Sequence, residues 1–244
     1  MSPDRVRDQL LAYFWSGDAI RSRSVSEVVL TGSLELPAPP ARLSADWRRE
    51  TLRLGLEAGD VEPLSLARSR ARWPDYRRCL QAMRDWMDSL RLHGMLDTSE
   101  LALMACLGAN YHHDAAQYGG SAFCNLFLSE DRGQDLHFPA TGQRIPLDRG
   151  RVVIFDTAQP HAVIGRHGTG FAKSDFPAEP DSSQVFLSWE LPIEQAELAR
   201  ALGTSFDIDP ATAGRLDQGQ VWLNGAPANL CLDSGRWRQD GAHG

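Results

Sequence analysis

Hydrophobic residues are spaced differently on the two sides of residue 100. Before it, apolar positions recur every three or four residues, a spacing typical of helices. The clearest helix follows Pro74-Asp75 and ends at His93-Gly94. Its apolar face is formed by Tyr76, Leu80, Met83, Trp86, Met87 and Leu90. We expect these side chains to form core contacts rather than a cofactor site.

Two more helices are expected in the first part of the chain. One spans residues 2–17, with Ser2 as its N-cap, and its apolar face would consist of Val6, Leu10, Leu11 and Phe14. The other begins at Ser44 or Asp46 and ends at Gly55. Between them, the stretches 28–30 and 34–36 have the composition of strands.

After residue 100 the apolar residues form short runs separated by Gly, Pro, Asp and Ser. These runs are residues 101–107, 121–128, 134–138, 151–155, 161–164 and 185–191. Many short strands at such spacing predict a sandwich or barrel. Residues 194–202 read as a helix, and residues 221–225 as part of a small hairpin.

The pattern predicts one domain over residues 1–244. We expect a mostly helical N-terminal support over 1–100, a β core over 101–192 and a C-terminal extension over 193–244. The class is therefore α+β with a mainly β core. A chain of 244 residues can bury such a core without disulfides, and its four cysteines form no CxxC pair. We expect them to be reduced, as in a cytoplasmic protein.

Charge and hydropathy exclude some classes of function. The formal net charge of −7 does not favour nucleic acid as a partner. No apolar stretch approaches the ~20 residues of a membrane span, and the N-terminus lacks the apolar core of a signal peptide. The expected partner is a small molecule or a peptide.

Two histidines and an aspartate form the most informative polar group. His112 and Asp114 share one face of a strand-like segment, and His161 begins a later strand directly after Pro160. In a closed β structure the two segments can return to the same opening. Two imidazoles and one carboxylate fix three positions around a metal ion and leave others open, as in non-haem Fe(II) oxygenases. The alternative, a solvated surface turn, is weakened by the apolar strands around these residues.

Five segments of the chain, taken in sequence order, resemble the Fe(II)/2-oxoglutarate-dependent dioxygenase superfamily, especially its prolyl-hydroxylase-like branch. The resemblance covers roughly residues 100 to 192 and depends on the segments 110–114 (NYHHD), 133–139 (GQDLHFP), 146–156 (PLDRGRVVIFD), 160–163 (PHAV) and 185–189 (VFLSW). It implies a double-stranded β-helix (jelly roll) with N-terminal helices packed on one sheet. It also implies that His112, Asp114 and His161 are the iron ligands and the catalytic centre.

The same resemblance implies a reaction. Fe(II) and the cosubstrate 2-oxoglutarate, with ascorbate as a further candidate, would hydroxylate an unactivated C–H bond and release succinate and CO2. The substrate would be a small amino-acid-like compound, a natural-product intermediate or a peptide. A halogenase is disfavoured because Asp114 supplies the carboxylate that such halogenases lack.

The cosubstrate anchor departs from the family pattern. The family usually holds the far carboxylate of 2-oxoglutarate with an Arg or Lys on the last core strand, but no cation lies just before Trp189. Arg166 is the first candidate for this contact, Lys173 the second and Arg151 a weaker third. Asn125, a polar residue in an apolar run, is a candidate for hydrogen bonding to the cosubstrate or a satisfied core amide.

Two other functions stay open at this point. The missing cation gives some weight to a cupin-like metal oxygenase that needs no 2-oxoglutarate. A degenerate relative that binds a ligand without turnover is the third possibility. Consumption of 2-oxoglutarate would distinguish the first hypothesis from both.

Overall fold

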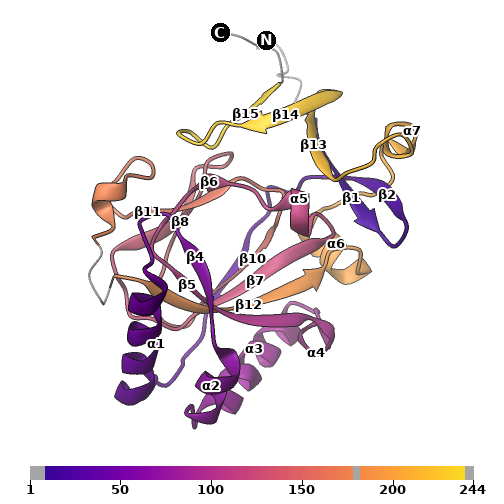
Figure 1. The fold of residues 1–244 in the computed structure, drawn as a ribbon. Coiled ribbons are helices and arrows are strands. Elements are labelled where there is room, and N and C mark those ends of the chain that lie inside the picture. The colour runs from indigo at the N-terminus through magenta and orange to yellow at the C-terminus, as the bar shows by residue number, and fades with distance from the viewer. Residues whose placement is uncertain (1–8, 178–181, 240–244) are drawn as a thin grey trace, which may run out of the picture.

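The computed structural model describes residues 9–177 and 182–239, and within them the protein is mostly β (Figure 1). Every strand pairing is antiparallel, in sheets of six, four and five strands. No helix in the described part of the chain is long and apolar enough to cross a membrane. The architecture therefore consists of antiparallel sheets supported by short helices.

The six-stranded sheet is the centre of the fold. Its strand order is β3-β10-β7-β12-β5-β4. The strands are β3 (Leu30–Ser33), β10 (Arg151–Asp156), β7 (Ser121–Phe127), β12 (Gln184–Pro192), β5 (Glu100–Cys106) and β4 (Val61–Leu64).

The four-stranded sheet faces it, in the order β6-β11-β8-β9. Its strands are β6 (Ala109–His112), β11 (His161–Gly165), β8 (Gln134–Phe138) and β9 (Gln143–Pro146). The apolar cluster between the two sheets includes Phe127, Phe138, Phe155 and Phe186.

Helices cover the outer face of the six-stranded sheet, below it in Figure 1. They are α1 (Ala41–Leu54), α2 (Leu66–Ala71), α3 (Tyr76–Ser89) and α4 (Met95–Thr98). Residues of strand β12 pack on both faces of the sheet. Leu187, Trp189 and Leu191 pack toward the helices, whereas Phe186 packs in the cluster between the sheets. This period of two is what a sheet buried on both faces requires.

The third sheet joins the two ends of the chain, in the order β15-β14-β13-β1-β2. Its strands are β1 (Leu10–Ser16), β2 (Ala19–Ser24), β13 (Gln220–Leu223), β14 (Ala226–Leu230) and β15 (Trp237–Gln239). The remaining elements are α5 (Ala115–Tyr118), the 3-10 turn η1 (Lys173–Asp175), α6 (Ala196–Leu202) and α7 (Pro210–Ala213).

Several predicted elements are confirmed. The helix after Pro74-Asp75 is α3, and α1 ends at Gly55, whose φ of 66° makes it a left-handed C-cap. That helix begins at Ala41, earlier than the predicted Ser44 or Asp46. The hairpin turn at Asn224-Gly225 is also confirmed between β13 and β14.

The helix predicted over residues 2–17 is wrong where the structure describes it. Residues Leu10–Ser16 form β1, and the N-terminal part of that prediction, with Ser2 and Val6, lies outside the described residues. Strand β1 pairs with β2 on one side and with β13 on the other. Leu11 to Phe14 are all buried, so the apolar spacing does not alternate and resembles that of a helix. The first hundred residues are thus a mixture of helices and strands.

Strand β3 also differs from its prediction. It covers Leu30–Ser33, between the two predicted strands at 28–30 and 34–36. Its position is set by pairing with β10, where Arg151 lies opposite Ser33. A ladder with a strand about a hundred residues away is not visible in the local pattern.

Candidate metal centre and its cavity

The structure brings His112, Asp114 and His161 together. His112 ends β6 and His161 begins β11, and the two residues face each other across the antiparallel ladder. One ligand atom from each of the three side chains lies within 4.8 Å of the others. Asp114 Oδ2 is 3.6 Å from His161 Nε2 and 3.9 Å from His112 Nε2. These atoms can contact a single metal ion.

Backbone hydrogen bonds orient both imidazoles toward this point. Nδ1 of His112 lies 2.7 Å from the carbonyl oxygen of Asn110, and Nδ1 of His161 lies 3.0 Å from that of Gln159. A carbonyl oxygen can only accept, so each Nδ1 donates its proton and each Nε2 keeps a free lone pair. This tautomer is the one that metal-binding histidines need. Burial lowers the pKa of His161 well below its ordinary value, and His112 adds to the effect, so the ring is neutral.

Asp114 supports a cation site independently. Its Oδ2 is buried and has no hydrogen-bond partner among the described residues. Burial raises the pKa of this carboxyl, an effect that His112 partly offsets. A buried carboxylate oxygen without a hydrogen-bond partner is costly, and a bound cation removes that cost. The residues therefore fit a metal ion.

Two buried contacts join the segments that carry the three side chains. The backbone N–H of Asp114 donates to the carbonyl of Thr157 at 2.7 Å, and the Thr157 hydroxyl donates to the carbonyls of Tyr118 and Ser121. Arg23 then bridges the same two segments, with Nε 2.8 Å from the Gly119 carbonyl and its guanidinium on Asp156. Sequence analysis missed Arg23, because nothing near it in the chain indicates this contact.

The three side chains line a cavity of about 290 Å³ between the two central sheets. Its other walls are mostly apolar and aromatic. Its lining residues include Tyr118, Asn125, Phe127, Phe186, Ser188 and Glu190. Such a concave, largely apolar space with a few polar groups is typical of small-molecule sites.

Asn125, Ser188 and Glu190 are the polar side chains added by the six-stranded sheet. Asn125 is buried, and its Oδ1 has no hydrogen-bond partner among the described residues. Ser188 lies opposite Asn125 in the ladder of β12 and β7. Burial and the neighbouring Glu100 carboxylate raise the pKa of Glu190. The alternation along β12 could have identified Ser188 and Glu190 from the sequence.

Arg166 and Lys173 do not reach this cavity. The guanidinium of Arg166 is 2.5 Å from Asp131 Oδ2 and 2.9 Å from Asp135 Oδ1, and it does not line the cavity. Lys173 is exposed in η1. Arg151 pairs with Asp148 at 3.1 Å. Among the described lining residues there is no arginine or lysine, so none of the three predicted anchors lies where a cosubstrate bound in this cavity would be.

The other polar candidates near the site have structural contacts. His113 packs against Trp237 with ring centroids 4.7 Å apart and ring planes tilted by 47°, and it is not part of the three-residue group. Burial lowers the pKa of His113 to about 4. The hydroxyl of Tyr111 lies 2.6 Å from Nδ1 of His137, and neither residue lines the cavity. Tyr118 does line it.

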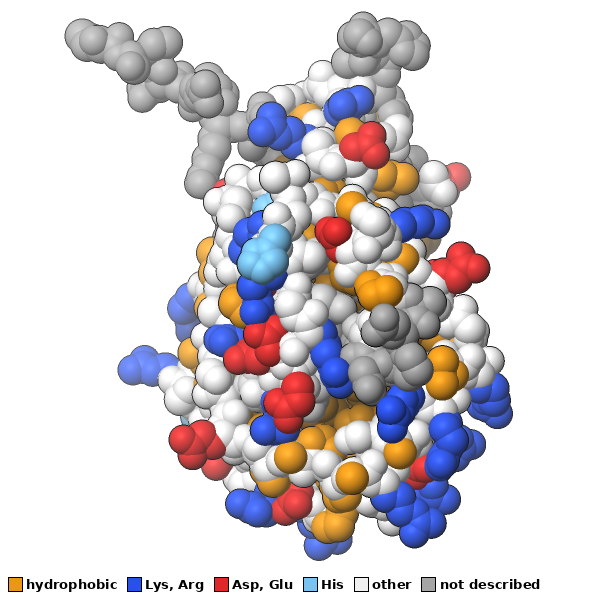
Figure 2. All heavy atoms as spheres, turned by 90° about the vertical axis from the view of Figure 1, so that its left-hand side faces the viewer, with side chains coloured by type: hydrophobic (Ala, Val, Ile, Leu, Met, Phe, Trp, Pro, Cys, Tyr) orange, Lys and Arg blue, Asp and Glu red, His pale blue; other side chains and the backbone are white. Residues whose placement is uncertain are grey.

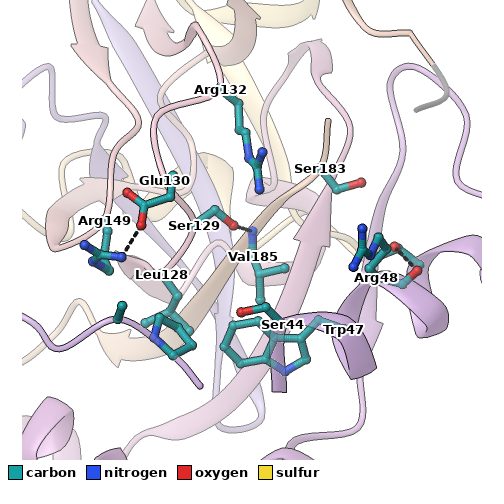
Figure 3. Close-up of a pocket in the computed structure, with 13 residues that line it drawn as sticks. Ser44, Trp47, Arg48, Leu128, Ser129, Glu130, Arg132, Arg149, Ser183 and Val185 are labelled. Carbon is teal, nitrogen blue, oxygen red and sulfur yellow. Dashed lines mark hydrogen bonds and ion pairs between the residues drawn. The ribbon is translucent and has the colours of Figure 1, made fainter. Parts of the chain in front are cut away.

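A second, smaller pocket of about 120 Å³ lies beside α1, near the ends of β7 and β12 that are remote from the three ligands (Figure 3). Arg48, Arg132 and Arg149 line it, and Arg149 is paired with Glu130.

On the face drawn in Figure 2, basic and acidic side chains are interspersed over much of the surface. That mixture does not resemble a nucleic-acid binding surface.

Comparisons with known proteins give similar structures but no sequence match. No protein-family model matches the chain, and no curated protein matches it. Among similar solved structures is the viral collagen prolyl hydroxylase of Paramecium Bursaria Chlorella virus-1 in its 2OG complex. The TM-score is 0.39 at 10% identity, over 66% of this chain and 94% of that one.

Two further structures are similar at the same level. A Pseudomonas putida prolyl-4-hydroxylase has a TM-score of 0.39 at 16% identity, over 67% of this chain and 92% of that one. The non-heme alpha ketoglutarate dependent epimerase SnoN, from nogalamycin biosynthesis, has a TM-score of 0.37 at 14% identity, over 84% and 92%. Because the identities and TM-scores are low, the chemistry below is argued from the residues of this chain.

Proposed function

We propose that this protein is an Fe(II)-dependent dioxygenase that consumes a 2-oxo acid, of the 2-oxoglutarate-dependent type that its sequence resembles. One observation carries the proposal. Two Nε2 atoms and an unpartnered carboxylate oxygen, from His112, His161 and Asp114, converge within 4.8 Å in a largely apolar cavity. Neutral imidazole and carboxylate are suitable ligands for Fe(II), and three ligands leave positions for cosubstrate and dioxygen.

The fold that we infer is a double-stranded β-helix. The orders β5-β12-β7-β10 and β6-β11-β8-β9 give two facing four-stranded antiparallel sheets, and from β5 to β12 successive strands alternate between the sheets except for the hairpin of β8 and β9. This alternation brings the ends of β6 and β11 together beside the cavity. The helices α1 to α4 support the outer face of the larger sheet.

When bound, the iron would supply activation of dioxygen. The overall reaction is the decarboxylation of a 2-oxo acid to CO2 and the next shorter carboxylate, coupled to hydroxylation of a C–H bond. One oxygen atom enters the new carboxylate and the other enters the substrate. The chain would hold the ligands in their tautomers, exclude bulk water and orient the substrate within the aromatic walls. Tyr118 and Glu190 are the polar groups available to a small amino-acid-like or peptide substrate.

The test is decarboxylation by the purified protein. Fe(II), dioxygen and a panel of 2-oxo acids that includes 2-oxoglutarate should give CO2 release that stops when iron is removed. The variant His161→Ala should lose this activity. His93→Ala is the matched control, because that ring is exposed at the end of α3. CO2 release that is equal in both variants would refute the proposal.

A cupin-like oxygenase that needs no 2-oxo acid is the second candidate. It is favoured by the absence of arginine and lysine among the described residues that line the cavity. Iron-dependent uptake of dioxygen with a substrate and without any 2-oxo acid would support it. Retention of metal with no turnover under either condition would instead indicate a relative that binds without catalysis.

A further inference from the structure

The far end of the cavity does not match the charge of a dicarboxylate. We propose that the cavity selects a 2-oxo acid whose side chain is uncharged and apolar, in preference to 2-oxoglutarate. This inference rests on the proposed function and names the class of its cosubstrate. It follows from the order of side chains along β12, from the charges around the cavity and from the contacts of the nearby arginines.

Three side chains of β12 line the cavity in successive layers. Glu190 lies opposite Phe123, Ser188 opposite Asn125 and Phe186 opposite Phe127. The Glu190 layer is near the ligands. There the Phe123 ring lies 6.0 Å from that of Phe155, which lies 4.7 Å from that of His161. Phe186 is four residues further along the strand, about 13 Å at 3.3 Å per residue. Phe186 thus marks the end of the cavity that is remote from the metal site.

That end is closed by apolar side chains. The rings of Phe186 and Phe127 lie 5.2 Å apart. Met104 lies opposite Phe186 in the ladder of β5 and β12, Cys106 lies two residues further along β5, and both line the cavity. Phe186 occupies an inward position before Trp189, on the strand where the resembled family usually places its Arg or Lys. A methyl-bearing side chain gains from contact with these walls, whereas a carboxylate loses its hydration there.

Charge balance leads to the same conclusion. A divalent cation is neutralised by Asp114 together with the first carboxylate of a chelating 2-oxo acid. A second carboxylate would leave an uncompensated negative charge, since no arginine or lysine is found among the described lining residues. Asn125 and Ser188 can donate hydrogen bonds but cannot neutralise it. If the far carboxylate of the 2-oxo acid pointed toward the opposite end of the cavity, it would approach Glu190, another acid.

Two arginines at the four-stranded sheet are engaged in other contacts. Arg144 donates to Asp135 and to the backbone carbonyls of Gly165, Arg166 and Gly168. Arg166 is held by Asp131 and Asp135. The arginines drawn in Figure 3 line the separate pocket beside α1, with Trp47 and Val185. Moving Arg144 or Arg166 into the cavity would break several charge-assisted hydrogen bonds.

The experiment compares two 2-oxo acids of the same shape. In 5-methyl-2-oxohexanoate, an isopropyl group replaces the far carboxylate of 2-oxoglutarate. Each is titrated anaerobically into the Fe(II)-loaded protein, and the visible charge-transfer band of the chelate gives its dissociation constant without turnover. We expect the neutral compound to bind at least about tenfold more tightly, which corresponds to about 1.4 kcal/mol. Tighter binding of 2-oxoglutarate would overturn the inference.

A variant and a metal control separate the possible failures. Phe186→Arg places a cation at the apolar end and should shift the preference toward 2-oxoglutarate by at least about tenfold. An unchanged preference in the folded variant would contradict the assignment of this end, and the ranking in the unmodified protein decides the proposal if the variant does not fold. If Fe(II) binds but neither acid gives a band, the proposed dependence on a 2-oxo acid is wrong. A reversed ranking of the two acids would instead contradict only the inference about selectivity.

Discussion

Arg23 and Asp156 form a two-pronged ion pair inside the protein. Nη1 lies 2.6 Å from Oδ2 and Nη2 lies 2.7 Å from Oδ1, and both side chains are fully buried. The carboxylate also accepts the backbone N–H groups of Ser26 and Ala158. This pair ties β2, which is remote in sequence, to the end of β10, five residues before the ligand His161.

Loss of Arg23 should destabilise the protein strongly. Arg23→Met leaves the Asp156 charge buried without its cation, and removal of one partner of a buried pair costs about 3–5 kcal/mol. The matched control is Arg21→Met, two residues away on the same strand. Arg21 also pairs with acids, Glu194 and Asp207, but its side chain is 33% exposed. An exposed pair contributes about 0–1 kcal/mol. Urea unfolding of both variants measures the difference, and equal losses would contradict this account.

A close approach of two strands makes Gly150 hard to replace. Its φ is +88°, and an added Cβ would lie 2.0 Å from the carbonyl oxygen of Leu34, whose N–H donates to Gly150. Gly142 has a similar positive φ of +70° but open space around it. Gly142→Ala should therefore cost only the backbone strain, about 1–2 kcal/mol. Gly150→Ala should cost at least about 2 kcal/mol more, since the clash is with backbone. Thermal unfolding would show this order, and the reverse order would refute it.

The four cysteines should divide into one reactive and three protected thiols. Cys79, Cys106 and Cys124 are buried, and burial raises the pKa of Cys79 to about 11 and that of Cys106 to about 12. Cys231 is partly exposed, and hydrogen bonds from Ser234 and the local backbone lower its pKa below the ordinary value. Its reactive thiolate therefore forms at a lower pH than in a free cysteine.

A thiol reagent at pH 8 should thus modify one site in the folded protein and four after denaturation. The variant Cys231→Ser should abolish the fast reaction. In the unmodified protein, the rate should reach half its plateau below the pH at which free cysteine does. Rapid modification of a second thiol in folded protein would show that one of the buried cysteines becomes accessible.

The sequence was sufficient to predict that His112, Asp114 and His161 lie together and where most of the core strands are. From Leu187 to Pro192 of β12, buried and partly buried residues alternate, whereas β10 and β11 are buried almost throughout, and the sequence shows both patterns. Arg166, the first candidate for the cosubstrate anchor, is instead held by Asp131 and Asp135, which the sequence around it does not indicate.

The errors concern features that depend on distant segments. Strand β1 was predicted as a helix because its apolar residues do not alternate, and its strand conformation depends on pairing with β13, some two hundred residues later. The contact of Arg23 with Asp156 spans 133 positions in the sequence. The uncharged far end of the cavity depends on which side chains of several strands share a layer, and no single segment contains that information.

Metal binding tests the central claim most directly. Fe(II), titrated anaerobically and followed by calorimetry, should bind with one equivalent per chain. Asp114→Ala should weaken binding by at least about 100-fold, since loss of even an outer partner costs about 10–100-fold. His113→Ala is the control, because that ring packs against Trp237 and is outside the three-residue group. Retained binding in His113→Ala with loss in Asp114→Ala is the predicted result. Equal affinity in the unmodified protein and Asp114→Ala, or no binding by either, would contradict the account.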